Sequence, residues 1–165
     1  MIARKWVLAF ALVSGGVAAH SHPAANAPAT EDVDAAAQEA ARAVDAFGAA
    51  IHAGKIQKAA DWLAPDLLVL ESGGAERSRD QYLAEHAAAD AAFLADAQVE
   101  RGHRVARASG DMAWVGTEST VTRTVGGKAM RYFSTETMVL RRGREGWKIV
   151  HIHWSSRADK AAPAN

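Results

Sequence analysis

Residues Gly146–Arg157 read GWKIVHIHWSSR, a stretch typical of a β-strand with apolar residues on both faces. Side chains alternate between the two faces of a strand. One face is therefore predicted to carry Trp147, Ile149, His151, His153 and Ser155, and the other Lys148, Val150, Ile152 and Trp154. Two imidazoles about 7 Å apart on one strand face predict a site there. The rest of the chain has to supply the other side of that site.

The composition is that of an ordinary globular protein. The chain has 165 residues, of which 49% are hydrophobic and 23% charged, with a formal net charge of zero and no cysteine. This length favours one domain. The balanced charge lacks the basic surface that nucleic-acid-binding proteins carry, so no nucleic-acid partner is expected. The absence of cysteine excludes a lipoprotein-type anchor.

Residues 1–19 have the pattern of a secretory signal peptide. Arg4 and Lys5 precede an apolar run over residues 6–17, which is too short for a comfortable membrane span. Val17-Ala18-Ala19 then supplies the small residues that a signal peptidase recognises. Cleavage after Ala19 predicts a periplasmic or secreted protein with no membrane attachment. An uncleaved anchor helix is the alternative.

The expected division of the chain is a signal peptide over residues 1–19, a flexible leader over 20–30, one domain over 31–157 and a loose tail over 158–165. The leader has one chemical feature. A free amine at His20, followed by His22, provides nitrogens that can hold Cu(II) or Ni(II). The alternative is an accidental pair of histidines in a disordered segment.

Helical patterns fill the first half of the domain. Thr30 or Asp32 is predicted to cap a long helix that ends near His52. Its buried stripe is predicted to contain Ala36, Ala40, Val44, Phe47 and Ile51. A short helix over residues 55–63 follows, and then two short strands over 67–71 and 75–77. Ser78, with Gln81 reaching back, is predicted to cap a third helix to residue 95. One face of this helix carries Tyr82, His86, Ala89 and Phe93.

Strand patterns fill the second half. Residues 99–108, 112–125 and 128–142 are predicted strands that precede the strand over 146–157. Turn residues separate them, including Gly126-Gly127 in a two-residue hairpin. Helices followed by a run of antiparallel strands predict an α+β fold, with the helices on one face of a bent sheet.

The residues at the end of the chain also resemble a known family. Thr135–Arg142, TETMVLRR, followed by Gly146–Ser156, is similar to the nuclear transport factor 2-like superfamily, in particular its SnoaL-like and kinase-association-domain-like group. Those proteins end on a similar strand with two histidines flanking one residue. The stretches LESGG at 70–74 and RSRDQY at 77–82 resemble exported members of the same set.

The resemblance covers residues 35–157 and implies a specific architecture. It implies a cone-shaped curved antiparallel sheet wrapped around a long helix, in the order α-α-β-β-α-β-β-β-β. A pocket is expected at the open end of the cone. Members of the family commonly form homodimers through the outer face of the sheet, and Trp114 and Trp154 are candidates for such an interface.

Within that pocket we expect His86 from the third helix to meet His151 and His153 from the last strand, beside Glu136 on the neighbouring strand. A small ligand would then contact Tyr82, His86, Tyr132 and His153, with Glu71 and Arg131 at the rim. Apolar walls with a few convergent polar groups are the usual form of such a site. A satisfied core histidine is the alternative for His86.

Two further chemistries suit these residues. His151 and Glu136 could form a catalytic proton-transfer pair for a lyase-like or isomerase-like reaction. The first helix lacks the tyrosine that ketosteroid isomerases use as oxyanion donor, which does not support an isomerase of that kind. Alternatively, His86, His151 and His153 could bind copper or zinc, which would make the chain a periplasmic metal-binding protein.

Overall fold

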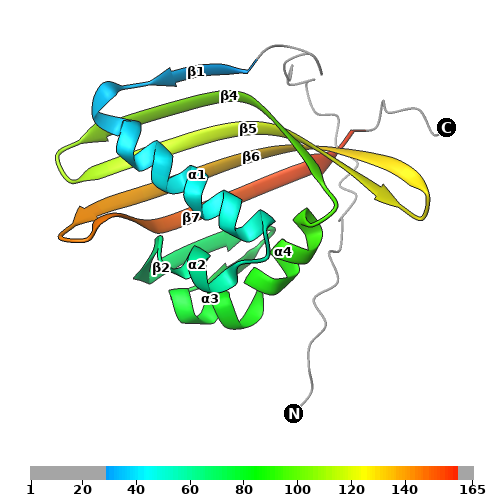
Figure 1. The fold of residues 1–165 in the computed structure, drawn as a ribbon, viewed down its shortest axis with the longest axis horizontal. Coiled ribbons are helices and arrows are strands. Elements are labelled where there is room, and N and C mark those ends of the chain that lie inside the picture. Colours follow the sequence, from blue (N-terminus) through cyan, green and yellow to red (C-terminus); the bar gives the residue numbers. More distant parts are fainter. Residues whose placement is uncertain (1–28, 160–165) are drawn as a thin grey trace.

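The computed structural model describes residues 29–159, which form one curved seven-stranded sheet and a group of helices (Figure 1). The strand order across the sheet is β1-β4-β5-β6-β7-β2-β3. The strands are β1 (Thr30–Val33), β2 (Leu63–Glu71), β3 (Gly74–Glu76), β4 (Gln98–Ser109), β5 (Met112–Val125), β6 (Lys128–Gly143) and β7 (Gly146–Ala158). The helices are η1 (Ala35–Ala37), α1 (Gln38–His52), α2 (Ile56–Ala60), α3 (Arg79–Glu85) and α4 (Ala87–Leu94).

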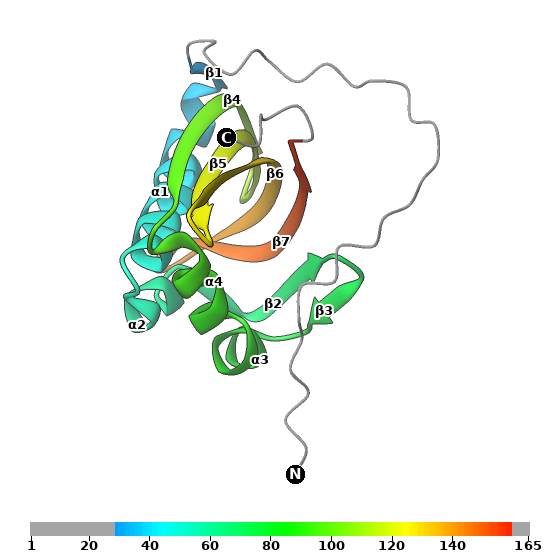
Figure 2. The same ribbon diagram turned by 90° about the vertical axis from the view of Figure 1, so that its right-hand side faces the viewer.

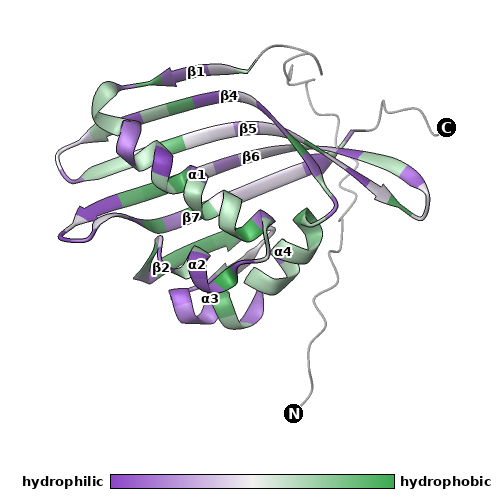
Figure 3. Cartoon of the chain, in the orientation of Figure 1, coloured by the Kyte–Doolittle hydropathy of each residue, from purple (hydrophilic) through white to green (hydrophobic). Residues whose placement is uncertain are grey.

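Helix α1 lies across the concave face of the sheet, and α2, α3 and α4 gather beside β2 (Figure 2). The apolar stripe of α1 packs Val44, Phe47 and Ile51 into the core, where each is at most 3% exposed. The opposing sheet surface supplies Val115, Met138, Leu140, Ile149 and Ile152. Figure 3 shows this hydrophobic character on α1 and on the strand segments behind it. The predicted α+β cone and its element order are therefore confirmed, and β5 has the predicted bounds.

The start of the domain differs from the prediction. Residues Thr30–Val33 form β1, which pairs in parallel with β4, and α1 begins only at Gln38. Neither Thr30 nor Asp32 caps a helix. Asp32 Oδ2 instead accepts a hydrogen bond of 2.6 Å from Arg107, and this bond lowers the pKa of Asp32. The segment thus pairs with the edge of β4 as a strand instead of forming the first turn of the helix. Ala36 is exposed rather than buried.

The middle of the chain also corrects two boundaries. Strand β2 begins at Leu63, so α2 ends at Ala60 and Pro65 lies within the strand. The predicted third helix is broken at His86 into α3 and α4. Its N-cap is confirmed, because the Ser78 side chain accepts a hydrogen bond of 3.1 Å from the Gln81 backbone N–H.

A β-bulge in β7 changes which residues share a face. Val139 pairs with His151, but Leu140 pairs with Ile149, so Val150 is an extra residue in β7. Ile149 and Ile152 are both fully buried, which an uninterrupted alternation forbids. The inner face therefore carries Trp147 and Ile149 before the bulge, and Ile152 and Trp154 after it. His151 and His153 lie on the outer face, opposite to the face predicted for them to share with Ile149.

No helix within residues 29–159 has both the length and the apolar character needed to cross a membrane. The predicted signal peptide, the leader residues 20–28 and the tail residues 160–165 lie outside the described part of the chain.

Candidate functional site

Strand register aligns five side chains in a row across the concave face. Thr117 lies opposite both Arg104 and Glu136, and Trp154 lies opposite both Glu136 and Glu71. The row thus crosses β4, β5, β6, β7 and β2, which lie side by side in Figure 1. We call these residues the concave row: Arg104, Thr117, Glu136, Trp154 and Glu71.

Glu136 is the central acid of the concave row. Its Oε2 accepts a hydrogen bond of 2.8 Å from the indole Nε1 of Trp154. Burial raises the pKa of Glu136, while the Trp154 hydrogen bond and the positive charge of Arg104 act in the opposite direction. The side chain is half-buried and still partly exposed. Such a carboxyl group is a stronger base than a solvated one.

Arg104 fixes one end of the row beneath α1. Its guanidinium is 5% exposed, donates to Asp45 Oδ1 on α1 at 2.7 Å and donates to Thr117 Oγ1 at 3.2 Å. Arg101 reaches the same Asp45 at 3.2 Å, because a register shift between Arg101 and Arg104 turns both toward it. The arginines of β4 are therefore engaged with acidic side chains of the same chain.

A second polar cluster lies beyond Glu71, between β3 and the α3–α4 break. The Tyr82 hydroxyl donates to Asp90 Oδ2 at 2.9 Å, and the His86 ring contacts the buried Glu76 carboxylate. Burial raises the pKa of Asp90 and of Glu71, and the negative charge of Asp90 adds to the shift of Glu71. Burial also raises the pKa of Tyr82 far above its usual range. Carboxyl groups with raised pKa values therefore gather at this end of the row.

Two aromatic pairs join α3 and α4 to the sheet. The rings of Tyr82 and Trp154 have centroids 6.2 Å apart, and those of Phe93 and Tyr132 are also 6.2 Å apart in an edge-on arrangement. The Arg123 guanidinium lies 4.4 Å from the Phe93 ring centre. Aromatic rings and a few acids are the residue types expected in a site for a small organic ligand.

The same fold occurs in known proteins. Residues 40–159 match the model of the SnoaL-like domain family. The chain belongs to this SnoaL-like family. No curated protein matches the chain.

Solved structures similar to this SnoaL-like domain have varied names. One is a proposed ketosteroid isomerase from Shewanella frigidimarina, 28% identical over 75% of this chain and 99% of that one, with a TM-score of 0.69. Another is a proposed calcium/calmodulin-dependent protein kinase II association domain from Xanthomonas campestris, 28% identical over 78% and 91%, with a TM-score of 0.60. A proposed dehydratase from Streptomyces avermitilis, 18% identical over 75% and 96% with a TM-score of 0.60, shares the fold.

The SnoaL-like domain brings together only some of the predicted site residues. Glu136 lies in the concave row, the Tyr82 ring packs against Trp154 of that row, and the Tyr132 ring packs against Phe93. His151 lies opposite Val139 on the outer face, and its Nδ1 is 2.9 Å from the carbonyl oxygen of Leu68. The predicted His151–Glu136 pair is therefore not formed, since the bulge at Val150 turns the two side chains to opposite faces.

The predicted metal set is not assembled either. His86 is held by Glu76 beside α3, whereas His151 and His153 lie on the other side of the sheet. Among residues 29–159, no three histidine, aspartate or glutamate side chains are placed to hold one metal ion. The predicted copper ligands His20 and His22 lie outside the described residues.

The sequence patterns do not predict three residues of the site. They place Trp154 on the outer face and Glu76 within a short strand, and they give Asp90 no role. The spacing of Asp90 is the one signal that was available, because it follows Tyr82 by eight residues and His86 by four, on one helical face.

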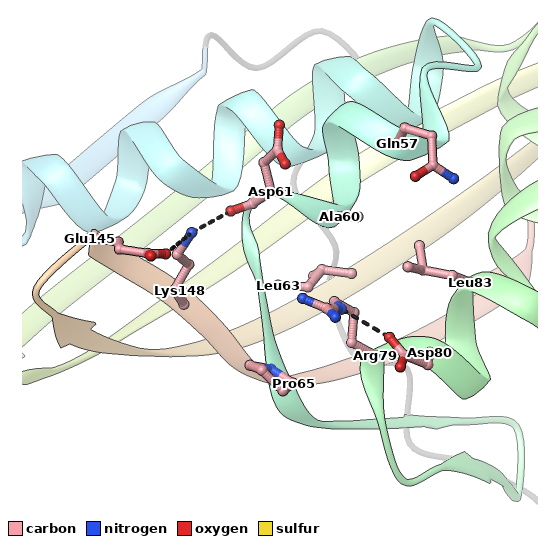
Figure 4. A pocket seen from close by; sticks show the side chains of 10 residues that line it. All are labelled: Gln57, Ala60, Asp61, Leu63, Pro65, Arg79, Asp80, Leu83, Glu145 and Lys148. Atoms are coloured by element: carbon pink, nitrogen blue, oxygen red, sulfur yellow. Dashed lines mark hydrogen bonds and ion pairs between the residues drawn. The ribbon is translucent and has the colours of Figure 1, made fainter.

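A separate hollow of about 540 Å³ lies on the outside of the SnoaL-like domain, between α2, α3, the start of β2 and the β6–β7 turn (Figure 4). Its charged groups already have partners. Arg79 contacts Asp80 at 3.1 Å, and Lys148 donates to the Asp61 carbonyl at 2.7 Å and lies 3.4 Å from Glu145. Because these cations are satisfied by the wall itself, the concave row is the stronger candidate site.

Proposed function

We propose that this SnoaL-like domain binds a small, mainly apolar molecule on its concave face and that Glu136 moves a proton of that molecule. The observation that carries the proposal is the state of Glu136. It is a partly exposed carboxyl group whose pKa is raised by burial, and the Trp154 indole holds it in one orientation. A base positioned in this way suits proton abstraction next to a carbonyl group.

The two carboxyl groups of the concave row, Glu136 and Glu71, have different roles in this proposal. Glu136 and Glu71 lie on either side of Trp154, and the pKa of each is raised mainly by burial. Two carboxyl groups in different surroundings can act as base and acid in one reaction. In this proposal Glu136 takes the proton, Glu71 donates one, and the aromatic walls orient the ligand.

The similar structure that is named a proposed ketosteroid isomerase supports proton transfer as the reaction class. Helix α1 has no tyrosine, so the proposal does not extend to the steroid reaction of that enzyme class. The substrate class is an enolisable ring-sized ketone, which matches a site with apolar walls and two acids.

The test of this proposal measures how fast the protein exchanges the α-hydrogens of a ketone for deuterium. A panel of saturated and β,γ-unsaturated cyclic ketones is incubated with the protein in D₂O, and loss of the α-hydrogen signals is measured by NMR. We expect Glu136→Gln to slow the exchange by about 100-fold or more, the usual contribution of a general base. Trp154→Phe keeps the Glu136 carboxyl group but removes the indole hydrogen bond that orients it, so this variant should slow the exchange by roughly 10-fold.

The matched control is Glu145→Gln, because Glu145 is an exposed acid on the β6–β7 turn. This variant should exchange like the unmodified protein. Binding of a ketone without any exchange above buffer would reject proton transfer, and exchange that survives in Glu136→Gln would reject Glu136 as the base.

We further propose that two copies of the chain associate through the outer face of the sheet. The support is a group of exposed apolar side chains on that face, Trp114 and Met112 on β5 and Leu68 on β2, which are 42%, 39% and 36% exposed. The similar structure named as an association domain is consistent with self-association. Trp154 takes no part in this proposal, since it faces the concave side.

An exported location is also part of the proposal. It depends on the signal-peptide pattern of residues 1–19 and is independent of the concave row.

A further inference from the structure

The bulge in β7 leaves two imidazoles on the outer face. His151 is half-buried opposite Val139, and His153 is exposed opposite Thr137. Residues two apart on a strand face are separated by about 7 Å at the backbone. Rotation of the exposed His153 side chain can bring its ring toward that of His151. The two rings are therefore neighbours on a surface rather than parts of the core.

One of the two rings is already oriented for coordination. His151 Nδ1 lies 2.9 Å from the Leu68 carbonyl oxygen. A carbonyl oxygen only accepts hydrogen bonds, so Nδ1 carries the hydrogen, and in the neutral ring Nε2 is the nitrogen with a lone pair for a metal. Metal-binding histidines are characteristically held by this kind of bond from the second ring nitrogen to a backbone carbonyl.

Three cations on this side of the sheet are paired with acids, whereas Arg157, on the same face of β7, lies over the Phe133 ring. Arg107 lies 2.6 Å from Asp32, Arg141 lies 3.0 Å from Asp66, and Lys148 lies 3.4 Å from Glu145. Each of these pairs reduces the repulsion that a bound cation would meet at the two imidazoles. The row across the outer face also carries Trp114, which lies opposite Val139 just as His151 does.

We propose that His151 and His153 form a two-imidazole site for a divalent transition metal, zinc or copper, and that the same pair from a second copy completes it. Imidazole nitrogens are good ligands for both metals. Residues 29–159 provide no third side chain for the site within one chain. A two-fold axis places the same patch of each copy face to face, so two pairs give the four ligands of a tetrahedral zinc ion.

This site rests on the outer-face association proposed above, and the experiment separates the two. Untagged protein carrying His20→Gln and His22→Gln is used, so that the leader histidines cannot bind the metal. Calorimetric titration with ZnCl₂ measures the stoichiometry, and sedimentation velocity measures self-association in EDTA and in zinc. We expect one zinc per two chains and a dimer that dissociates at protein concentrations at least 10-fold lower in zinc than in EDTA.

Adding His151→Gln and His153→Gln should weaken zinc binding by at least 100-fold and remove the zinc effect on the dimer, while the dimer in EDTA remains. The control is His103→Gln, because the His103 ring is held by Thr30 at 2.7 Å on β4, three strands away. Its zinc binding should be unchanged. If the outer-face association itself is wrong, the unmodified protein will sediment as a single chain in EDTA.

Three results would overturn the site: no zinc binding, binding that survives in the double variant, or one zinc per chain with no change in association. Proton exchange by Glu136 should be the same in all of these variants, since the two sites lie on opposite faces of the sheet.

Discussion

The chemistry of the concave face depends on the hydrogen-bond partner of Glu136. A histidine partner would compete for the proton, because an imidazole can accept one near neutral pH. The indole of Trp154 only donates, so it orients the carboxylate without taking its proton. A proton that Glu136 gains must therefore come from a ligand or from water. Replacing the expected His151–Glu136 pair by a Trp154–Glu136 pair thus strengthens Glu136 as a base that acts directly.

The raised pKa of Glu136 predicts a pH-dependent effect of Glu136→Gln on stability. Because the pKa is higher in the folded state than in the unfolded state, ionised Glu136 destabilises the fold, and this cost grows as pH rises through the folded pKa. Glutamine keeps an acceptor for Trp154 and has no charge. We expect Glu136→Gln to have a higher melting temperature than the unmodified protein at pH 7.5 and the same melting temperature at pH 4.

Thermal unfolding followed by circular dichroism across pH 4–8 measures this difference. Glu145→Gln, at an exposed acid, should show no comparable pH trend. A Glu136→Gln variant that is less stable at every pH would mean that the carboxylate makes a net stabilising contact, which would contradict the role given to burial.

At the scale of elements, the sequence predicted the regular strands and helices, but it did not predict the β-bulge in β7 or the added strand β1. The Val- and Thr-rich stretch from Met112 to Val125 predicted β5 with its observed bounds. The bulge at Val150 leaves no mark in the alternation, because apolar residues occupy both faces around it. Strand β1 depends on the bonds from Arg107 and His103, which lie about 70 residues away in the chain. Long-range contacts therefore decided the parts of the fold and the site that local patterns missed.

The attachment of α1 to the sheet gives a prediction about Asp45. Arg104 is 5% exposed and depends on Asp45 for its charge partner, whereas the contact between Arg101 and Glu31 is exposed. Asp45→Ala leaves a buried guanidinium without a carboxylate, so we expect a loss of about 2–3 kcal/mol in the free energy of unfolding. Glu31→Ala removes only an exposed ion pair and should cost less than about 1 kcal/mol.

Urea denaturation of the two alanine variants makes this comparison. Equal losses would show that Arg104 finds another partner, for example water. A second variant, Arg104→Met with Asp45→Ala, should recover part of the loss, since it removes the buried charge as well as its partner.

At the scale of the whole molecule, one strand serves two surfaces. The bulge at Val150 turns Trp154 inward to Glu136 and leaves His151 and His153 outside. The concave face is partly covered by α1, whereas the described helices leave exposed apolar side chains on the outer face. Ligand chemistry and self-association can therefore change independently of each other, because no side chain proposed for one belongs to the other.

The outer-face association is tested by Trp114→Arg. Trp114 is 42% exposed and shares the row that contains Val139 and His151. An arginine there would face the same arginine of a second copy across a two-fold axis and would bury an unpaired charge. Light scattering with size-exclusion chromatography should give twice the chain mass for the unmodified protein and the single-chain mass for the variant.

The control is Val125→Arg, which changes a side chain that is 51% exposed at the β5–β6 hairpin, about 36 Å along β5 from Trp114. Its mass should remain that of the dimer. Circular dichroism and ketone exchange should be unchanged in both variants, because neither residue contacts the concave row. A Trp114→Arg variant that keeps full activity as a single chain would show that association through the outer face is not needed for the chemistry of Glu136. A dimer that survives this change would place the interface elsewhere and would remove the support for a metal site shared by two copies.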